Sequence, residues 1–427
     1  MNSVAPPPVP AWPNAEDVAD DIIDSLARYL RCHTVTPPGQ VGDAVALLAG
    51  LLAEHGIETT IIEPFAGKPI LVARLAGETA DQGLILLSHS DVVPADGPWT
   101  HPPFSGQVAD GFIWGRGALD MKAMGIMQLW AMVLLRRAGV RLAHDVTLIV
   151  VPDEEQGGAQ GAEWLTRERP DLCRGRWLLN EGGMGLRIAD SDQSVFLCST
   201  GEKGPVWIKL SAEGKASHSA IPTGHNALEI LTAAIARVLA RPQNLEIQAH
   251  HYRTAELLGV PPETTNRLYL RPQLSDTISL TMLNGGTKQN VIPETASAVI
   301  DCRLLPERSL SSFLADLRGW LADDRVAVEV LVDRCATASP VDSALVTALR
   351  HAIGDRFPAA DFLPMVAPYF TDSMFFRKLG IECFGLMPIL LEEDDLGRIH
   401  GRDERISVEN VIRGTDIIAD IALRLCG

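Results

Sequence analysis

The stretch LILLSHSDVV, residues 84–93, indicates the fold into which the rest of the chain must fit. Its first half is a continuous aliphatic run, and its second half carries His89 and Asp91. A run of this kind is typical of a strand buried on both faces, as in a parallel sheet covered by helices. Comparable runs, separated by helical stretches, lie at residues 57–62, 70–75, 146–151 and 177–179.

Helical periodicity fills the intervals between these runs. A first helix is predicted from residue 15 to about 32 with Asn14 as its N-cap, and a second from about 44 to 55, ending at Gly56. The pattern resumes late in the chain with a strand at 381–387 and a helix at 407–425. The sequence therefore predicts an α/β domain, a mostly parallel sheet with helices on both faces.

The pattern changes in the middle of the chain, where Val206, Ile208 and Leu210 alternate with polar neighbours, as expected of half-buried strands. The predicted order is strand 205–213, helix 226–240, strand 277–283, strand 295–304, helix 309–322 and strand 326–332. This is the β-α-β-β-α-β order of a ferredoxin-like α+β domain. We therefore expect an inserted domain at 202–335 between the two parts, 1–201 and 336–427, of the larger one.

Composition limits the classes of partner. The 427 residues are 46% hydrophobic and carry a formal net charge of -17, with basic residues scattered, which argues against nucleic acid. The seven cysteines are dispersed without a C-x-x-C pair, no export signal is visible, and the apolar stretch 123–135 is too short to span a membrane. We expect a cytoplasmic protein whose acidic excess is either solvated surface or in part a cation site.

Five places just past apolar strands or in the following loops carry side chains that bind metals. One such residue alone would be an ordinary surface or capping residue, but the carboxyl ends of strands in an open α/β sheet converge on one edge. His89 and Asp91 point to the same side in extended chain, so we expect the carboxylate to accept a hydrogen bond from the imidazole. The candidates are His89 and Asp91, Asp120, Glu154 and Glu155, Glu181, and His400.

These segments resemble the successive signatures of the M20 metallopeptidases, the group that includes aminoacylase, carboxypeptidase G and succinyl-diaminopimelate desuccinylase. The resemblance covers nearly the whole chain after about residue 15, and it implies a zinc-binding α/β domain interrupted by a lid and dimerisation domain. The matching segments are HSDVVP, WTHPPFSGQVADGFIWGRGALDMK, DEEQGG, NEGG and HGRDERI.

The resemblance also implies the role of each residue. Asp120 would bridge two zinc ions, His89 and Glu181 would complete one site, and Glu155 and His400 the other. Glu154 would be the general base, Asp91 would support His89, and the peptide bond from Asp120 to Met121 would be cis. The ligands alone also suit cobalt or manganese. Adjacent Glu154 and Glu155 can serve one site only if the chain turns there, as Gly157 and Gly158 allow.

Three residues of the inserted domain match family positions that contact substrate. His218 in KASHSAIP would reach across a dimer and stabilise the developing oxyanion, and Asn290 and Arg303 would bind substrate. The alternatives are that Asn290 shapes a turn and that Arg303 pairs with Asp301 or Glu307. Thr371, Asp372 and Ser373 occupy a TDS-like loop that we interpret as structural support for the pocket.

The function expected from the resemblance is dinuclear zinc-dependent hydrolysis of the amide of an N-acyl amino acid or short peptide with a free carboxylate, by a homodimer. A water shared by the metals would give its proton to Glu154. The WTHPPFSG segment is most similar to the branch with carboxypeptidase S and N-acyl-amino-acid hydrolases. The alternatives are a dipeptidase or carboxypeptidase and, in another class, a non-catalytic binding protein on this fold.

Overall fold

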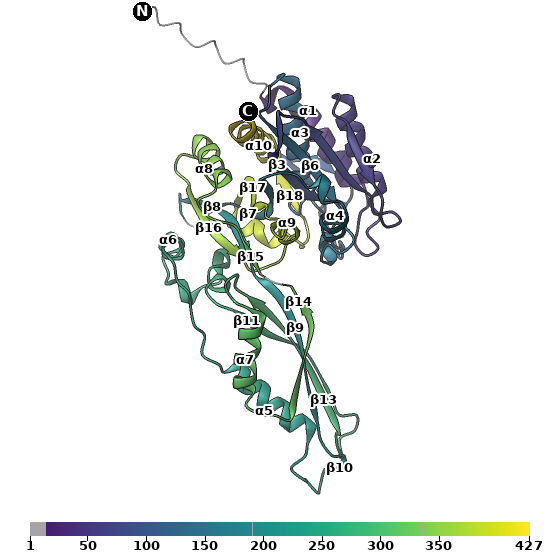
Figure 1. Ribbon diagram of the computed structural model, residues 1–427, viewed down its shortest axis with the longest axis vertical. Coiled ribbons are helices and arrows are strands. Elements are labelled where there is room, and N and C mark those ends of the chain that lie inside the picture. The colour runs from purple at the N-terminus through teal and green to yellow at the C-terminus, as the bar shows by residue number, and fades with distance from the viewer. Residues whose placement is uncertain (1–13, 190, 335) are drawn as a thin grey trace, which may run out of the picture. The chain divides into compact units, whose positions relative to one another are not determined.

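The computed structural model describes residues 14–189, 191–334 and 336–427; the Pro-rich start and Cys335 lie outside the described residues. The chain divides into two compact units (Figure 1). The first contains the described residues from Asn14 to Thr200 together with Ser339–Pro364 and Thr371–Gly427. The second contains Gly201–Ala338 and also Met365–Phe370, a short segment outside the expected boundaries of 202–335.

The main sheet is parallel at its centre and antiparallel at its edges. Its order is β1-β2-β6-β3-β7-β17-β8-β15, with β16 paired to β8. Strands β6, β3, β7 and β17 run parallel, whereas β1, β2, β8 and β15 pair antiparallel with their neighbours. The expected α/β fold with a mostly parallel sheet is confirmed. The bounds are β1 Thr59–Ile62, β2 Ile70–Leu75, β3 Thr79–His89, β6 His144–Val151, β7 Trp177–Arg187, β8 Ser194–Glu202, β15 Thr337–Ala338, β16 Asp361–Ala367 and β17 Glu382–Glu392.

Helix α3 (Lys122–Arg137) is the central helix of the first unit and is buried over almost its whole length. It packs against α10 (Val408–Cys426), α1 (Ala19–Arg31) and β3, so the apolar segment at 123–135 is a buried helix, as predicted. No helix among the described residues is long and apolar enough to cross a membrane. The other helices are α2 Gly42–Glu54, α4 Ala162–Glu168, α8 Ala344–Arg356 and α9 Ser373–Arg377, and a small sheet has the order β18 (Arg405–Ser407), β5 (Phe112–Trp114), β4 (Gln107–Ala109).

The second unit contains a four-stranded antiparallel sheet in the order β11-β13-β9-β14. Alternate side chains of β9 and β13 are buried and pack against the apolar faces of α5 and α7. The strands and helices together form the core of the unit. The ferredoxin-like order predicted from alternation is confirmed. The bounds are β9 Gly204–Glu213, α5 Ala227–Leu239, β11 Thr277–Gly285, β13 Thr295–Leu304, α7 Leu310–Leu321 and β14 Val326–Asp333.

One part of the second unit escaped prediction. Between α5 and β11 lie α6 (Ala249–Leu258) and three short 3-10 turns at Pro262–Thr264, Arg267–Tyr269 and Arg271–Gln273. Three-residue turns are too short to show a periodic pattern, and the prolines in this stretch interrupt longer ones. His251 lies in the first turn of α6 and caps it, because its ring Nδ1 accepts a hydrogen bond from the backbone N–H of Gln248 at 3.0 Å.

Candidate metal centre

The predicted metal ligands come together in the first unit because the strand ends carry them to one edge of the sheet. His89 is the last residue of β3, Glu154 and Glu155 form a 3-10 turn just past β6, and Glu181 lies in β7. Asp120 lies in the loop before α3, and His400 in the loop before β18. The peptide bond between Asp120 and Met121 is cis, as the resemblance implied.

Asp120 lies between two histidines. Its Oδ1 is 3.0 Å from His89 Nε2, and its Oδ2 is 3.0 Å from His400 Nε2. Glu181 Oε1 is 3.6 Å from His89 Nε2, and Glu155 Oε2 is 3.3 Å from His400 Nε2. Each oxygen of Asp120 therefore faces a different pair of ligands, which is the arrangement a carboxylate adopts when it bridges two cations.

The donor set fits divalent metal ions. His89, Asp120 and Glu181 form one group whose ligand atoms lie within 4.8 Å of one another, and Asp120, Glu155 and His400 form a second. Oε1 of Glu155 is buried without a hydrogen-bond partner, an arrangement that is costly unless another group satisfies it. Imidazole and carboxylate without thiolate suit zinc, cobalt or manganese.

The electrostatics of the cluster also favour bound cations. Burial, followed by the charge of a neighbouring acid, raises the pKa of Glu154 and of Glu181 well above their usual range. Burial would also raise the pKa of Asp120, but hydrogen bonds with His400 and His89 outweigh it and hold that pKa well below its usual range. Hydrogen bonds to Asp120 and Glu155 raise the pKa of His400 to about 10. Four acids around two imidazoles leave an excess of negative charge, which cations would neutralise.

The chain turns at Glu154 and Glu155, as required for both to serve one site, and the turn begins at Asp153. Asp153 has a left-handed backbone with φ 76°, and Gly157 follows with φ 96°. The Asp153 carboxylate accepts a hydrogen bond from Lys68 Nζ at 2.6 Å and another from the backbone N–H of Gln160 at 2.9 Å. This buried ion pair supports the strained turn, and no local sequence pattern joins Lys68 to Asp153.

Asp91 contacts His89 in a different way from our expectation. Its main-chain carbonyl oxygen lies 2.9 Å from Nδ1 of His89, whereas the nearer carboxylate oxygen lies 3.6 Å away. The carboxylate instead accepts from the backbone N–H groups of Glu154 at 3.3 Å and Glu155 at 3.4 Å. Asp91 thus contacts His89 through its main chain and the glutamate turn through its side chain. It therefore connects the histidine to the turn of the two glutamates.

Glu404 and Arg116 connect the loops of Asp120 and His400. Glu404 is fully buried and accepts from the backbone N–H groups of Gly117, Leu119 and Asp120 at 2.7–3.1 Å. Arg116 donates to Glu404 at 2.7 Å and to the carbonyl oxygen of His400 at 3.2 Å. Sequence reasoning missed both residues, although Glu404 lies in the HGRDERI segment; an acid in a predicted ligand loop was the available signal.

His218, Asn290 and Arg303 all belong to the second unit. His218 is exposed in the two-residue strand β10 (Ser217–His218), which pairs with β12 (Val291–Ile292). The carbonyl oxygen of Asn290 accepts from the backbone N–H of Ser219 at 3.1 Å, so these two predicted residues are neighbours. Arg303 lies on β13 and makes a two-pronged ion pair with Asp301 at 2.9 and 3.1 Å, the contact that our alternative reading anticipated.

The TDS segment is buried in the first unit beside the glutamate turn. Asn180 Nδ2 donates to Ser373 Oγ at 3.1 Å and lies 3.5 Å from Thr371 Oγ1. A Cβ atom on Gly158 would lie 2.3 Å from Oδ1 of Asp372, so the close approach of this segment requires glycine at 158. These contacts agree with a supporting role.

Comparisons with known proteins identify the family. The model of peptidase family M20/M25/M40 matches residues 85–424. Aminoacylase-1 of Sus scrofa is 30% identical over 404 residues, covering 92% of each chain. The N-fatty-acyl-amino acid synthase/hydrolase PM20D1 of Xenopus tropicalis is 31% identical over 442 residues, covering 93% of this chain and 84% of its own.

Among solved structures, an M20 family metallo-carboxypeptidase from Sulfolobus solfataricus superposes with a TM-score of 0.72 at 17% identity, covering 95% of this chain and 99% of its own. That likeness concerns the fold. The family model spans the residues of both ligand groups. The chain therefore belongs to peptidase family M20/M25/M40 and is a hydrolase of amide or peptide bonds.

Proposed function

We propose that the protein is a dinuclear, zinc-dependent hydrolase that cleaves the amide bond of N-acyl amino acids with a free carboxylate. The observation that carries the proposal is Asp120, whose two oxygens face the separate pairs His89 with Glu181 and Glu155 with His400. Glu154 lies beside this cluster in the same turn as Glu155. Cobalt or manganese would fit the same donors.

The metal ions and the residues of the cluster would have different roles in the reaction. Bound metal ions would supply positive charge that polarises the amide carbonyl and lowers the pKa of a bound water. Glu154 would accept a proton from the attacking water and later deliver it to the leaving amine. Burial raises the pKa of Glu154, which brings it closer to the pH at which such a group exchanges protons. Asp91 holds the backbone of this turn, so that Glu154 and Glu155 face one site.

The names of the relatives and the residues of the second unit support the proposed substrate class. Both curated relatives are named for activity on acylated amino acids, an aminoacylase and an N-fatty-acyl-amino acid synthase/hydrolase. Arg303 would bind the free carboxylate, which requires it to exchange or share its pairing with Asp301. His218 and Asn290 would contact the part of the substrate that carries the amide carbonyl. A dipeptidase or carboxypeptidase activity is the alternative within this chemistry.

We further propose that the protein is a homodimer formed through the second unit. Strand β11 pairs with β13 along one edge, and its residues from Ser279 to Gly285 are exposed. Met282 is 55% exposed and Leu283 is 48% exposed. An edge strand with apolar side chains is a template for pairing with another strand, here one from a second copy.

We expect the protein to reside in the cytoplasm. Cys32, Cys173, Cys198, Cys302 and Cys426 are free, and all of them except Cys32 are buried. Unpaired, buried thiols suit a reducing compartment.

The proposed function is tested by amine release from a substrate panel. The purified protein is loaded with zinc, cobalt or manganese and offered N-acetyl and long-chain N-acyl amino acids, dipeptides, and N-acyl amino acid amides that lack the carboxylate. We expect release from the N-acyl amino acids and a large loss with the amides. Preferential release from dipeptides would favour the alternative, and no release with any metal would contradict the proposal.

A further inference from the structure

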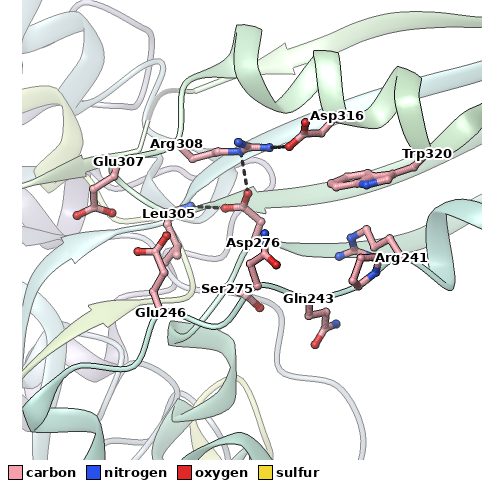
Figure 2. Close-up of a pocket in the computed structure, with 12 residues that line it drawn as sticks. Arg241, Gln243, Glu246, Ser275, Asp276, Leu305, Glu307, Arg308, Asp316 and Trp320 are labelled. Atoms are coloured by element: carbon pink, nitrogen blue, oxygen red, sulfur yellow. Dashed lines mark hydrogen bonds and ion pairs between the residues drawn. The ribbon is translucent and has the colours of Figure 1, made fainter.

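The second unit contains a cavity of about 260 Å³ that the proposed chemistry does not use (Figure 2). It lies between α7, the stretch that follows α5, and the ends of β11 and β13. Its volume is close to the lower end of the range for small-molecule sites, so an occupant has the size of an amino acid. None of its lining residues belongs to the metal centre.

One end of the cavity carries Arg241, which feels the charge of Asp276 but forms no ion pair with the carboxylates of the described residues. Arg241 is half-buried, its guanidinium lies 5.5 Å from the centroid of the Trp320 ring, and it donates to the carbonyl oxygen of Val238 at 3.3 Å. Within the described residues it has no carboxylate partner, and burial lowers its pKa. An anion brought to this end would therefore gain a two-pronged donor that the fold leaves unpaired.

The other arginine of the cavity is already neutralised. Arg308 forms an ion pair with Asp276 at 3.2 Å and a second with Asp316. Oδ1 of Asp276 also accepts from the backbone N–H of Leu305 at 2.8 Å. These contacts hold the centre of the cavity in place and leave Arg241 as the basic group available to a ligand.

The end opposite Arg241 and Trp320 is acidic. In Figure 2, Glu246 and Glu307 are drawn at that end of the pocket, with Ser275 and Asp276 between the two ends. Both glutamates are exposed, and their carboxylates have no ion-pair partner among the residues that the structure describes. With two arginines against Glu246, Glu307, Asp276 and Asp316, the lining carries a formal charge of 2 - 4 = -2.

We propose that this cavity binds a basic amino acid, a molecule with a carboxylate at one end and a cationic group at the end of an aliphatic chain. The carboxylate would pair with Arg241, the aliphatic chain would lie against Trp320, and the distal ammonium or guanidinium would face Glu246 and Glu307. The separation of the two charged ends favours a ligand whose charges are joined by a chain over one whose charges are adjacent. A net positive ligand also matches the net negative lining.

Calorimetry on the metal-loaded protein tests this with three probes of similar length. L-lysine has both end groups, L-norleucine lacks the distal ammonium, and 1,5-diaminopentane lacks the carboxylate. We expect lysine to bind at least about tenfold more tightly than either of the others, because each of them leaves one end of the cavity unmatched. Binding at the metal centre through the carboxylate is shared by lysine and norleucine, so it does not produce this difference.

Substitutions in the lining of the cavity test whether lysine binds there. Arg241→Gln and the double change Glu246→Gln with Glu307→Gln should each reduce lysine affinity about tenfold or more, with metal content and melting temperature unchanged. Arg318→Gln, an exposed arginine of α7 that does not line the cavity, is the matched control and should leave affinity unchanged. Equal binding of lysine and norleucine, or full lysine affinity in both cavity variants, would overturn the proposal.

Discussion

The residues of the metal centre and the substrate candidates of the second unit were predicted from the same kind of motif, yet the structure holds them differently. His89 and Asp91 are at most 2% exposed, and the metal-binding groups contact one another within a single unit. In the second unit, His218 is exposed and Arg303 is paired with its neighbour Asp301. The difference teaches that the residues proposed for the chemical step contact one another directly at a sheet edge, whereas the residues proposed for recognition are exposed or paired with a neighbour in the other unit.

The largest effect is expected from Asp120→Asn. Asparagine keeps the size but removes the charge that both histidine groups share, so both metals should bind weakly and turnover should fall to background. Metal content after gel filtration and amine release measure the two effects. Asp96→Asn, an exposed acid in the neighbouring loop, is the control. Full occupancy of both sites in Asp120→Asn would show that it does not bridge.

Glu404→Gln tests whether the Glu404 carboxylate positions the loops that carry Asp120 and His400. Its carboxylate holds the Asp120 loop and, through Arg116, the loop of His400. We expect the affinity of the His400 site to fall about 10- to 100-fold, the range for groups that orient ligands, while the His89 site changes less. Titration with a competing chelator resolves the two sites.

The exposed Glu409 serves as the matched control for Glu404, through Glu409→Gln. A parallel loss from both sites would contradict selective positioning, and Glu404→Asp should recover part of the affinity.

Mixing two inactive variants tests whether His218 acts across a dimer. Glu154→Gln and His218→Ala should each be nearly inactive alone. After subunit exchange, half the dimers are mixed and one of their two sites is intact, so about a quarter of wild-type activity should return. No recovery, despite exchange shown by mass spectrometry, would indicate sites complete within one chain.

Arg303→Gln should change recognition more than chemistry. We expect KM for N-acyl amino acids to rise about tenfold or more, with kcat less affected and metal content unchanged. N-acyl amino acid amides, which lack the carboxylate, should respond little. Asp301→Asn frees Arg303 from its ion pair and should lower KM. A fall in kcat alone would contradict the assignment of Arg303 to the carboxylate.

The smallest effect concerns acid stability of the second unit. Burial lowers the pKa of His251 to about 4, whereas an unfolded histidine titrates near 6.5. The unfolded chain thus binds the extra proton first, so this contribution is present above about pH 6.5 and is lost as the pH falls toward 4. In urea titrations the free energy of unfolding should fall by about 1–2 kcal/mol as the pH is lowered through this range, and His251→Gln should reduce that fall. An unchanged pH dependence in the variant would contradict this.

Much of the fold could be predicted because apolar runs and alternation report burial directly. Strand β13 has the predicted bounds, and β7 begins at Trp177 as predicted, but it continues to Arg187, so Glu181 lies within the strand and not just past it. The supporting contacts could not be predicted, because they join distant residues. Lys68 and Asp153 are 85 positions apart, and Arg116 and Glu404 are 288 apart, with no local pattern to pair them. The direction of the Asp91 carboxylate depended on backbone N–H groups that appear only when the glutamate turn forms.

Glu154→Gln tests the central claim most directly, because glutamine keeps the shape of the side chain and cannot accept the proton. The variant should retain two metal ions per chain, measured by mass spectrometry of the native protein, while amine release from N-acyl amino acids falls about 10²- to 10⁴-fold. Turnover that survives this change with both metals bound would contradict the account.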